Sequence, residues 1–273
     1  MSDQRLGDME MASYEASQNC CQNYEAMCAA NERAAAAQEA FNNAVNEMCI
    51  DEYDTSKMVE KQEKLQEATR EMNEAKAAAE AATKAFEASA DAAQEAQDNV
   101  EKKKEELRNS RTTDTSFVVL SARSECNFGT RTSQLALDTT HGVYTRGMYQ
   151  MTVKDIIANL NVINFCTCKS KENPKVIEAA QKVVDDANAE IEAKKGVRDW
   201  VIGLFVKPEK IEVTDSLLEQ CEGECIIEFA AGTEWTKGHE KVTINDEAPL
   251  LRRCELTCKY GGRIILLLSG QPE

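Results

Sequence analysis

Cysteines are the residues of this chain that are most capable of metal binding or covalent chemistry. The sequence contains 11 of them in 273 residues. Thiolates bind zinc, act as nucleophiles and form disulfides. The local spacings, Cys-x-Cys at 166/168 and Cys-x3-Cys at 221/225 and 254/258, differ from the usual zinc-finger knuckle. Spacing alone therefore leaves open a metal site, buried free thiols or disulfides formed outside the cell. Seven cysteines lie in the second half: Cys126, Cys166, Cys168, Cys221, Cys225, Cys254 and Cys258.

Catalytic signatures are missing from the sequence. It contains no P-loop, no G-x-G-x-x-G and no G-x-S-x-G motif. His141 and His239 are its only histidines, and no local pattern pairs either with a nucleophilic cysteine. His141 is better explained as a structural residue beside a tight turn at Gly142. We therefore predict that the protein is not an enzyme.

The composition excludes some partners. With 48 acidic and 32 basic residues, the formal net charge is −16, which disfavours nucleic acid and anionic membrane surfaces. The longest apolar run at the end of the chain, Ile264–Leu268, is far shorter than the roughly 20 residues that span a bilayer. The polar, acidic N-terminus does not resemble a signal peptide. We expect cytoplasmic synthesis, no stable membrane anchor, and any export by a route without a cleaved signal.

Two halves of different composition must position these residues. Residues 1–110 contain no proline, one glycine, and 24 acidic against 12 basic residues, whereas all four prolines and the other glycines come later. Low glycine and proline content with abundant Ala, Glu, Gln and Lys favours long helices. The first half is therefore predicted to be helical, and the second to be rich in turns and short strands. The stretch 109–116 (NSRTTDTS) reads as the linker between them.

Apolar residues of the first half recur every seven residues. Two such series, separated by the turn-like stretch 51–56 (DEYDTS), predict an antiparallel helical hairpin with an alanine-rich seam over residues 1–112. Cys20 belongs to this seam and is best explained as a small core residue. If the chain folds back at residue 53, the expected neighbours are Met48 with Met58, Phe41 with Leu65, Ala34 with Met72, and Cys20 with Phe86.

The second half, residues 113–273, changes period. Short β-like runs such as 117–120 (FVVL), 142–153 (GVYTRGMYQMTV), 241–246 (KVTIND) and 263–268 (RIILLL) are bounded by turn residues. They are interrupted at 174–205, where Pro174 precedes apolar residues at helical spacing and Gly196 is the expected stop. The predicted class is α+β: a helical hairpin followed by a β domain with an inserted helix.

Several motifs of the second half, taken together, resemble one family. They are SFVVLSARSECNFGTRTSQL (116–135), the block from HGVY (141–144) to the Asn-Pro at 173–174, and the closing block EWTKG…APLLRRCELTCKYGGRIILLLSGQ that ends at Gln271. In this order they are similar to the PAAR-like proteins, which cap the spike of bacterial contractile injection machines such as type VI secretion systems. The resemblance covers about 116–173 and 221–271, and leaves out the hairpin and the inserted helix.

The resemblance implies a fold and a site. PAAR-like proteins form a small cone of short strands whose base sits on a trimeric valine-glycine-repeat spike, and a bound metal, usually zinc, pins the apex. Four cysteines match the family blocks and are the implied zinc ligands: Cys126, Cys168, Cys225 and Cys258. The secondary candidates are Cys221, Cys166 and His141. This chain departs from PAAR proteins that hold the metal mostly by histidine, so cysteines would carry that role.

The expected function is structural. A spike-tip protein would sharpen the apparatus for membrane puncture and leave the producing cell at its tip, while the acidic hairpin would be available to an effector or adaptor. One alternative makes the hairpin the delivered cargo and the β domain only its address. A third interpretation is an unrelated zinc-stabilised binding domain.

Overall fold

The computed structural model of the chain describes residues 2–49, 55–193 and 211–272. The fold is α+β, as predicted, with long helices in the first half and small antiparallel sheets in the second. The chain divides into two compact units. The hairpin unit is Gln4–Lys103, and the β unit comprises Lys104–Glu273 with Met1–Asp3.

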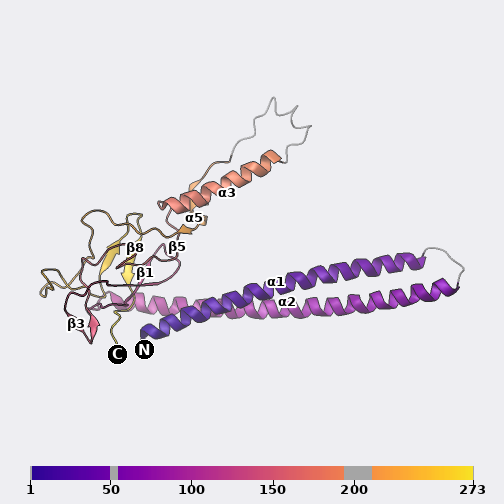
Figure 1. Cartoon of the computed structure of the whole chain (residues 1–273), viewed down its shortest axis with the longest axis horizontal. Coiled ribbons are helices and arrows are strands. Elements are labelled where there is room, and N and C mark those ends of the chain that lie inside the picture. The colour runs from indigo at the N-terminus through magenta and orange to yellow at the C-terminus, as the bar shows by residue number, and fades with distance from the viewer. Residues whose placement is uncertain (1, 50–54, 194–210, 273) are drawn as a thin grey trace, which may run out of the picture. The chain divides into compact units, whose positions relative to one another are not determined.

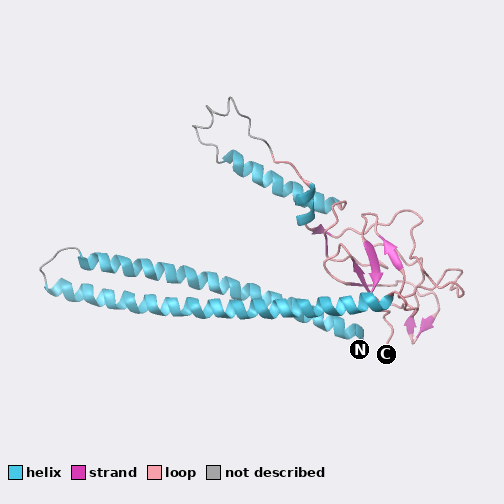
Figure 2. Cartoon of the chain, turned by 180° about the vertical axis from the view of Figure 1, so that it is seen from behind, coloured by secondary structure: helices cyan, strands magenta, loops and turns pink. Residues whose placement is uncertain are grey.

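The hairpin unit is formed by most of α1 (Ser2–Cys49) and α2 (Thr55–Arg111), which run side by side in opposite directions (Figures 1 and 2). Side chains at alternating three- and four-residue steps are the least exposed ones on both helices, and these positions include Ala68, Ala79 and Val100. This is the heptad seam that the sequence predicts. The seam does not extend to the turn as expected, because Met48 and Met58 are 39% and 55% exposed. Residues 51–54 of the predicted turn lie outside the described residues.

The pairing of the two helices differs from the expected one by about a helical turn. Phe86 lies beside Tyr24, with ring centroids 5.5 Å apart, rather than beside Cys20. Ala34 shares a groove with Lys76 and Ala79 instead of lying opposite Met72. The prediction paired equal heptad positions. The seam residues of each helix are separated by alternating steps of three and four residues. In an antiparallel pair one helix runs backwards, so a three-residue step on it faces a four-residue step on the other, and different heptad positions lie opposite each other.

The largest sheet of the β unit has four antiparallel strands in the order β2-β1-β8-β7. They are β1 (Arg123–Cys126), β2 (Ser133–Gln134), β7 (Glu255–Thr257) and β8 (Arg263–Leu266). β8 lies between β1 and β7, and Ile264 and Leu266 on it are fully buried. The predicted closing strand is therefore a central strand. Two further pairs are β3 (Tyr144–Thr145) with β4 (Met148–Tyr149), and β5 (Thr167–Cys168) with β6 (Gly223–Glu224).

Two predicted strands are reduced to isolated bridges. The 117–120 run contributes single bridges at Phe117 and Val119, and 241–246 contributes only the Ile244–Glu247 bridge. Both runs still bury apolar side chains, including Val118 and Ile244. Burial in these runs does not follow strand alternation, because the adjacent Val118 and Val119 are both buried and Val242 is 44% exposed.

The inserted helix is α3 (Pro174–Ala193), followed by the short α5 (Asp215–Gln220). The Asn173 side chain accepts a hydrogen bond from Lys175 N at 3.0 Å, which helps to start α3 at its proline. Gly223 of β6 lies against the first turn of α3, where an added Cβ would come within 2.4 Å of the Lys175 carbonyl carbon. Gly196 and the rest of the predicted insertion to residue 205 lie outside the described residues.

The last turns of α2 belong to the β unit, although composition places a linker at 109–116. Arg252 donates to the Leu107 carbonyl at 3.0 Å, to Ser110 Oγ at 2.9 Å and to Asp114 Oδ2 at 2.7 Å.

Two arginines of α2 itself also bind the β unit. Arg108 forms two hydrogen bonds with Glu125, and the buried Arg111 pairs with Glu255. Arginine side chains therefore lie at the C-terminal end of α2, where they donate to backbone carbonyls and where the helix dipole favours positive charge.

Candidate functional site

Four cysteines from distant parts of the sequence line one buried cavity. They are Cys126, Cys168, Cys225 and Cys258, each with 8% or less of its surface exposed. They come from the end of β1, from β5, from the residue after β6, and from the residue after β7. The four cysteines implied by the family resemblance are therefore the ones that folding brings together.

A tight turn positions Cys126 at the cavity. Gly129 N donates to the Cys126 carbonyl at 3.0 Å, which closes the Cys-x-x-Gly turn. The β7–β8 hairpin approaches from the other side, where Gly262 leaves no room for a side chain because an added Cβ would lie 2.8 Å from Cys126 Sγ. In the same hairpin, Cys258 N donates to the Gly262 carbonyl at 2.7 Å. The glycines thus allow Cys126 and the Cys258 loop to come close.

The β5–β6 pair supplies the other two thiols. Cys168 pairs with Gly223 across this pair, and Cys225 N donates to the Cys166 carbonyl at 3.0 Å. Ser170 joins this pair to the Cys258 loop, since its backbone N–H donates to Cys168 Sγ at 3.4 Å and its hydroxyl donates to the Tyr260 carbonyl at 2.7 Å. The four cysteine segments are therefore held together by hydrogen bonds as well as by packing.

Apolar and aromatic side chains enclose the rest of the cavity. The cavity volume is about 10 Å³, which is close to the minimum that holds one water molecule. Aromatic residues were not predicted as part of the site, although each stands one or two positions from a cysteine in the sequence, which could have indicated them. The walls besides the cysteines include Phe128, Phe165, Tyr260, Ile227 and Ile264.

Burial controls the electrostatics of these thiols. It raises the pKa of Cys126 to about 11, while hydrogen bonds from the backbone of Phe128 and Gly129 act in the opposite direction. Burial also raises the pKa of Cys225, and a backbone hydrogen bond from Phe165 opposes it. Backbone donors directed at sulfur are what a thiolate requires in a buried place. Without a cation, however, the neighbouring thiols favour the protonated form.

The donor set fits zinc in its chemistry. Four sulfur donors are a common structural zinc set, and a closed site of this kind links the segments that supply it. As the side chains stand, no group of three or more His, Cys, Asp or Glu residues within 2–49, 55–193 and 211–272 is arranged to hold a metal ion. The four thiols are therefore neighbours around one cavity, and a closed site would need their sulfurs to draw together.

The secondary candidates lie elsewhere. Cys166 is exposed and precedes β5, with a backbone φ of 71°. Cys221 is partly buried and ends α5, where its N–H donates to Leu217 O at 3.1 Å. His141 Nε2 lies 2.9 Å from Asp155 Oδ2, so this histidine is held by a structural contact. None of the three lines the cysteine cavity.

Cys254 is the remaining buried thiol of the β unit. It is fully buried, and its sulfur accepts from Leu251 N at 3.3 Å. Burial raises the pKa of Cys254 to about 11. It lies outside the cysteine cavity, which Cys258 lines.

The fold and the cysteine cavity define the class of protein: an α+β chain whose small β unit gathers four thiols from four segments. The chain belongs to the DUF4280 family, a domain of unknown function, whose model matches residues 118–271. That match covers nearly all of the β unit and leaves out the hairpin. No curated protein and no solved structure matches the chain. Among the described helices, none has both the length and the apolar character that crossing a membrane requires.

Proposed function

We propose that this protein is a spike-tip protein of a bacterial contractile injection system. In this role the β unit caps a trimeric valine-glycine-repeat spike, and zinc held by Cys126, Cys168, Cys225 and Cys258 stiffens the tip. The observation that carries the proposal is the convergence of these four cysteines on one cavity, because the motifs that resemble the PAAR-like family single out the same four residues.

The physical reasoning links the zinc to the mechanical role. The β unit is built from strands of two to four residues and from isolated bridges, which by themselves resist deformation poorly. A zinc ion would cross-link four of its segments at one point and add stability that short strands do not supply. Cys126 and Cys258 would fix β1 to the β7–β8 hairpin, and Cys168 and Cys225 would fix β5 to β6.

Metal content tests the site. Purified full-length protein should carry about one zinc per chain, measured by elemental mass spectrometry. Cys126→Ser should lower this stoichiometry and the melting temperature. Cys166→Ser is the matched control, because Cys166 is exposed and does not line the cavity. Protein without zinc whose stability does not respond to added zinc or to a chelator would contradict the metal site.

Binding to a spike tests the role. The full-length chain should co-purify with a trimeric valine-glycine-repeat protein from the same cell at one copy per trimer. A zinc-loaded chain that binds no spike would favour the third interpretation, an unrelated zinc-stabilised binding domain. The cargo alternative predicts normal spike binding by a chain lacking residues 4–103, together with loss of toxicity toward target cells.

A further inference from the structure

An uncharged stripe runs along α1 of the hairpin unit. Its residues follow one another at three- and four-residue steps, so they lie on one side of the helix. Tyr14 and Tyr24 on this stripe are 46% and 52% exposed. Tyr24 has only uncharged residues before and after it on the stripe, whereas Glu10 precedes Tyr14 by four residues. An exposed tyrosine with uncharged neighbours is typical of a protein interface. The stripe consists of Tyr14, Ser17, Cys21, Tyr24, Cys28, Asn31 and Ala35.

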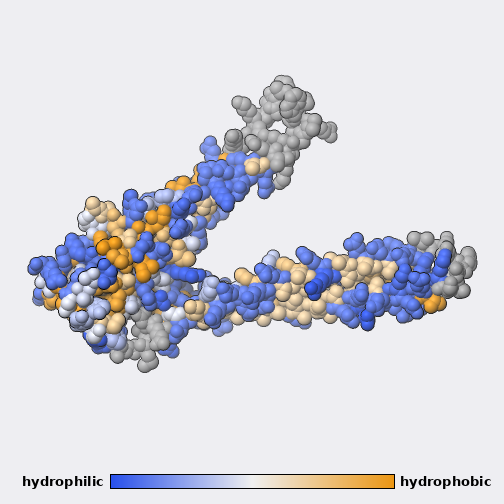
Figure 3. Space-filling view, in the orientation of Figure 1, coloured by the Kyte–Doolittle hydropathy of each residue, from blue (hydrophilic) through white to orange (hydrophobic). Residues whose placement is uncertain are grey.

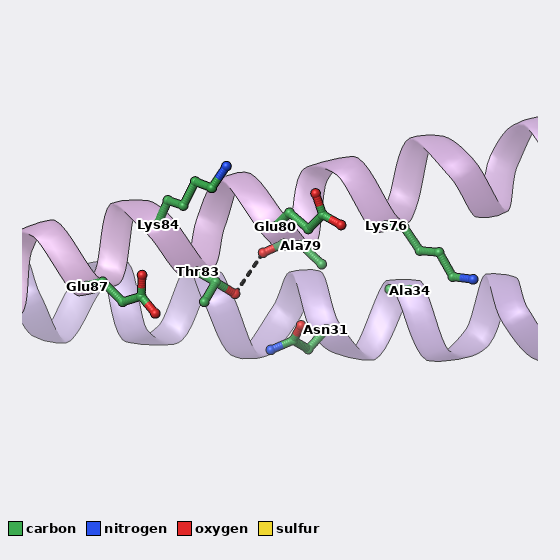
Figure 4. Close-up of a pocket in the computed structure, with 8 residues that line it drawn as sticks. All are labelled: Asn31, Ala34, Lys76, Ala79, Glu80, Thr83, Lys84 and Glu87. Carbon is green, nitrogen blue, oxygen red and sulfur yellow. Dashed lines mark hydrogen bonds between the residues drawn. The ribbon is translucent and has the colours of Figure 1, made fainter.

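The stripe continues into a groove between α1 and α2. Asn31 belongs to both, and the groove has a volume of about 490 Å³. Figure 4 shows Asn31 and Ala34 on one helix and the other lining residues on α2, where Thr83 Oγ1 donates to the Ala79 carbonyl at 2.9 Å. The stripe and the groove therefore form one continuous surface, to which α1 contributes uncharged residues and α2 contributes charged ones.

The charges on the α2 side alternate in sign along the helix. Lys76, Glu80, Lys84 and Glu87 line the groove. Along α2, all of which the structure describes from Thr55 to Arg111, these four side chains form no ion pair. If a second copy of α2 lies antiparallel to the first and the two are aligned at residue 82, position 80 of one copy faces position 84 of the other. Position 76 of one copy then lies close to position 87 of the other. The pattern is therefore complementary to its own reversed copy.

The same reversal suits α1. Because Tyr24 lies beside Phe86 and the helices are antiparallel, Cys28, four residues further along α1, is level with position 82 of α2. A twofold axis at this level would place α1 against α1 and α2 against α2 of a second copy. It would bring the two Cys28 residues near the axis.

We propose that the hairpin face formed by the uncharged stripe and the groove binds a second copy of this chain, in an antiparallel twofold dimer. Lys84 of each copy pairs with Glu80 of the other, and Lys76 pairs with Glu87. Cys28 lies close to the axis. The proposal concerns the hairpin alone and does not depend on the proposed function of the β unit.

Charge explains why a second copy fits this face. The hairpin unit carries 21 acidic and 10 basic residues, so two copies repel each other on most of their surface. The face described above is uncharged on α1 and self-complementary on α2. A cationic partner helix would instead be drawn to the outer side of α1, where Glu25, Glu32 and Glu39 recur every seven residues.

Sedimentation equilibrium of the full-length chain tests the proposal. The wild type should reach a monomer–dimer equilibrium in the micromolar range, and Lys84→Glu should weaken association about tenfold by turning two reciprocal attractions into repulsions. The double variant Glu80→Lys with Lys84→Glu keeps the complementarity, so its association should recover to near that of the wild type. Circular dichroism of each variant verifies that α2 remains helical.

Cross-linking locates the axis. A short bismaleimide should join two chains through Cys28, and the product should disappear in Cys28→Ser but persist in Cys21→Ser. A monomeric wild type at about 100 µM would overturn the proposal. So would equal weakening by the single and the double variant, or cross-links confined to Cys21.

Discussion

The hairpin unit and the β unit use their apolar residues in contrasting ways. In the hairpin, a seven-residue pattern repeats over two long helices, and the buried apolar side chains among the described residues are few: Leu6, Ala68, Ala79 and Val100. In the β unit, Trp235, Phe165 and Met151 are buried almost completely, although their segments are far apart in the sequence. On the face drawn in Figure 3, weakly hydrophobic residues lie along the hairpin, and strongly hydrophobic ones gather on the β unit.

This difference teaches where each unit is vulnerable. Each contact of the hairpin repeats along the helices, so the loss of one leaves similar contacts on either side. Each contact of the β unit joins particular segments, and the strands that would otherwise support it are only two to four residues long. We therefore expect single substitutions to act more strongly in the β unit, and the following predictions test that expectation in order of decreasing effect.

The largest effect is expected at Trp235. Its ring is buried and its Nε1 donates to the Asp155 carbonyl at 3.2 Å, so Trp235→Ala should lower the free energy of unfolding by about 3–5 kcal/mol. Phe86→Ala is the matched hairpin variant. Because Phe86 is only partly buried, its cost should be about 1–2 kcal/mol. Hydrogen exchange followed by mass spectrometry measures both units in one sample, and equal losses would contradict the comparison.

The junction at the end of α2 should be the next most sensitive place. Arg252→Ala removes hydrogen bonds to Leu107, Ser110, Asp114 and the Leu267 carbonyl, with an expected loss of about 3 kcal/mol. Arg252→Lys keeps the charge but cannot supply the same fork of donors, so it should recover only part of this. Faster amide exchange confined to 104–114 is the expected signature. Unchanged exchange there would show that the helix end is held by packing alone.

Alkaline pH should weaken the β unit through Cys254. Burial raises the pKa of this thiol in the folded protein to about 11, from an ordinary value of 9.0. A pKa raised by folding gives stability that is present below pH 9 and is lost as the pH rises toward 11, by about 2 kcal/mol. Urea unfolding between pH 8 and 11 measures this loss. Cys254→Ala has no thiol to ionise, so its stability should decline less steeply over the same range.

The smallest change concerns helix pairing and should leave stability nearly unaltered. With Tyr24 beside Phe86, position 34 is close to position 75, so the double variant Ala34→Cys with Ala75→Cys should form an intramolecular disulfide in mild oxidant. The pair Ala34→Cys with Met72→Cys tests the pairing that equal heptad positions would give. Peptide mapping distinguishes the two, and preferential bridging of 34 to 72 would restore the first expectation.

The sequence supported much of this architecture because its main patterns are local. Helix-forming composition and heptad spacing predicted both helices and most of their seam, and Pro174 marked the start of α3. The inward-facing residues of β8 also follow from local apolarity. Spacing did not predict which residues of the two helices lie opposite each other. If one helix is shifted along the other by about one turn, apolar seam residues still face apolar seam residues. The bridges at 117–120 and 241–246 depend on partners that no local pattern contains.

The sequence alone determined the class of the fold, the hairpin seam and, through the order of its motifs, a set of four cysteines. Tertiary structure decided which cysteines share a cavity: Cys225 enters it and Cys221 does not, because β6 pairs with β5 and carries the residue after it to the interior, whereas Cys221 ends α5. It also decided that Arg252 holds the end of α2. Local preference acts within a few residues along the chain, whereas a shared cavity depends on segments that meet only when the whole unit packs.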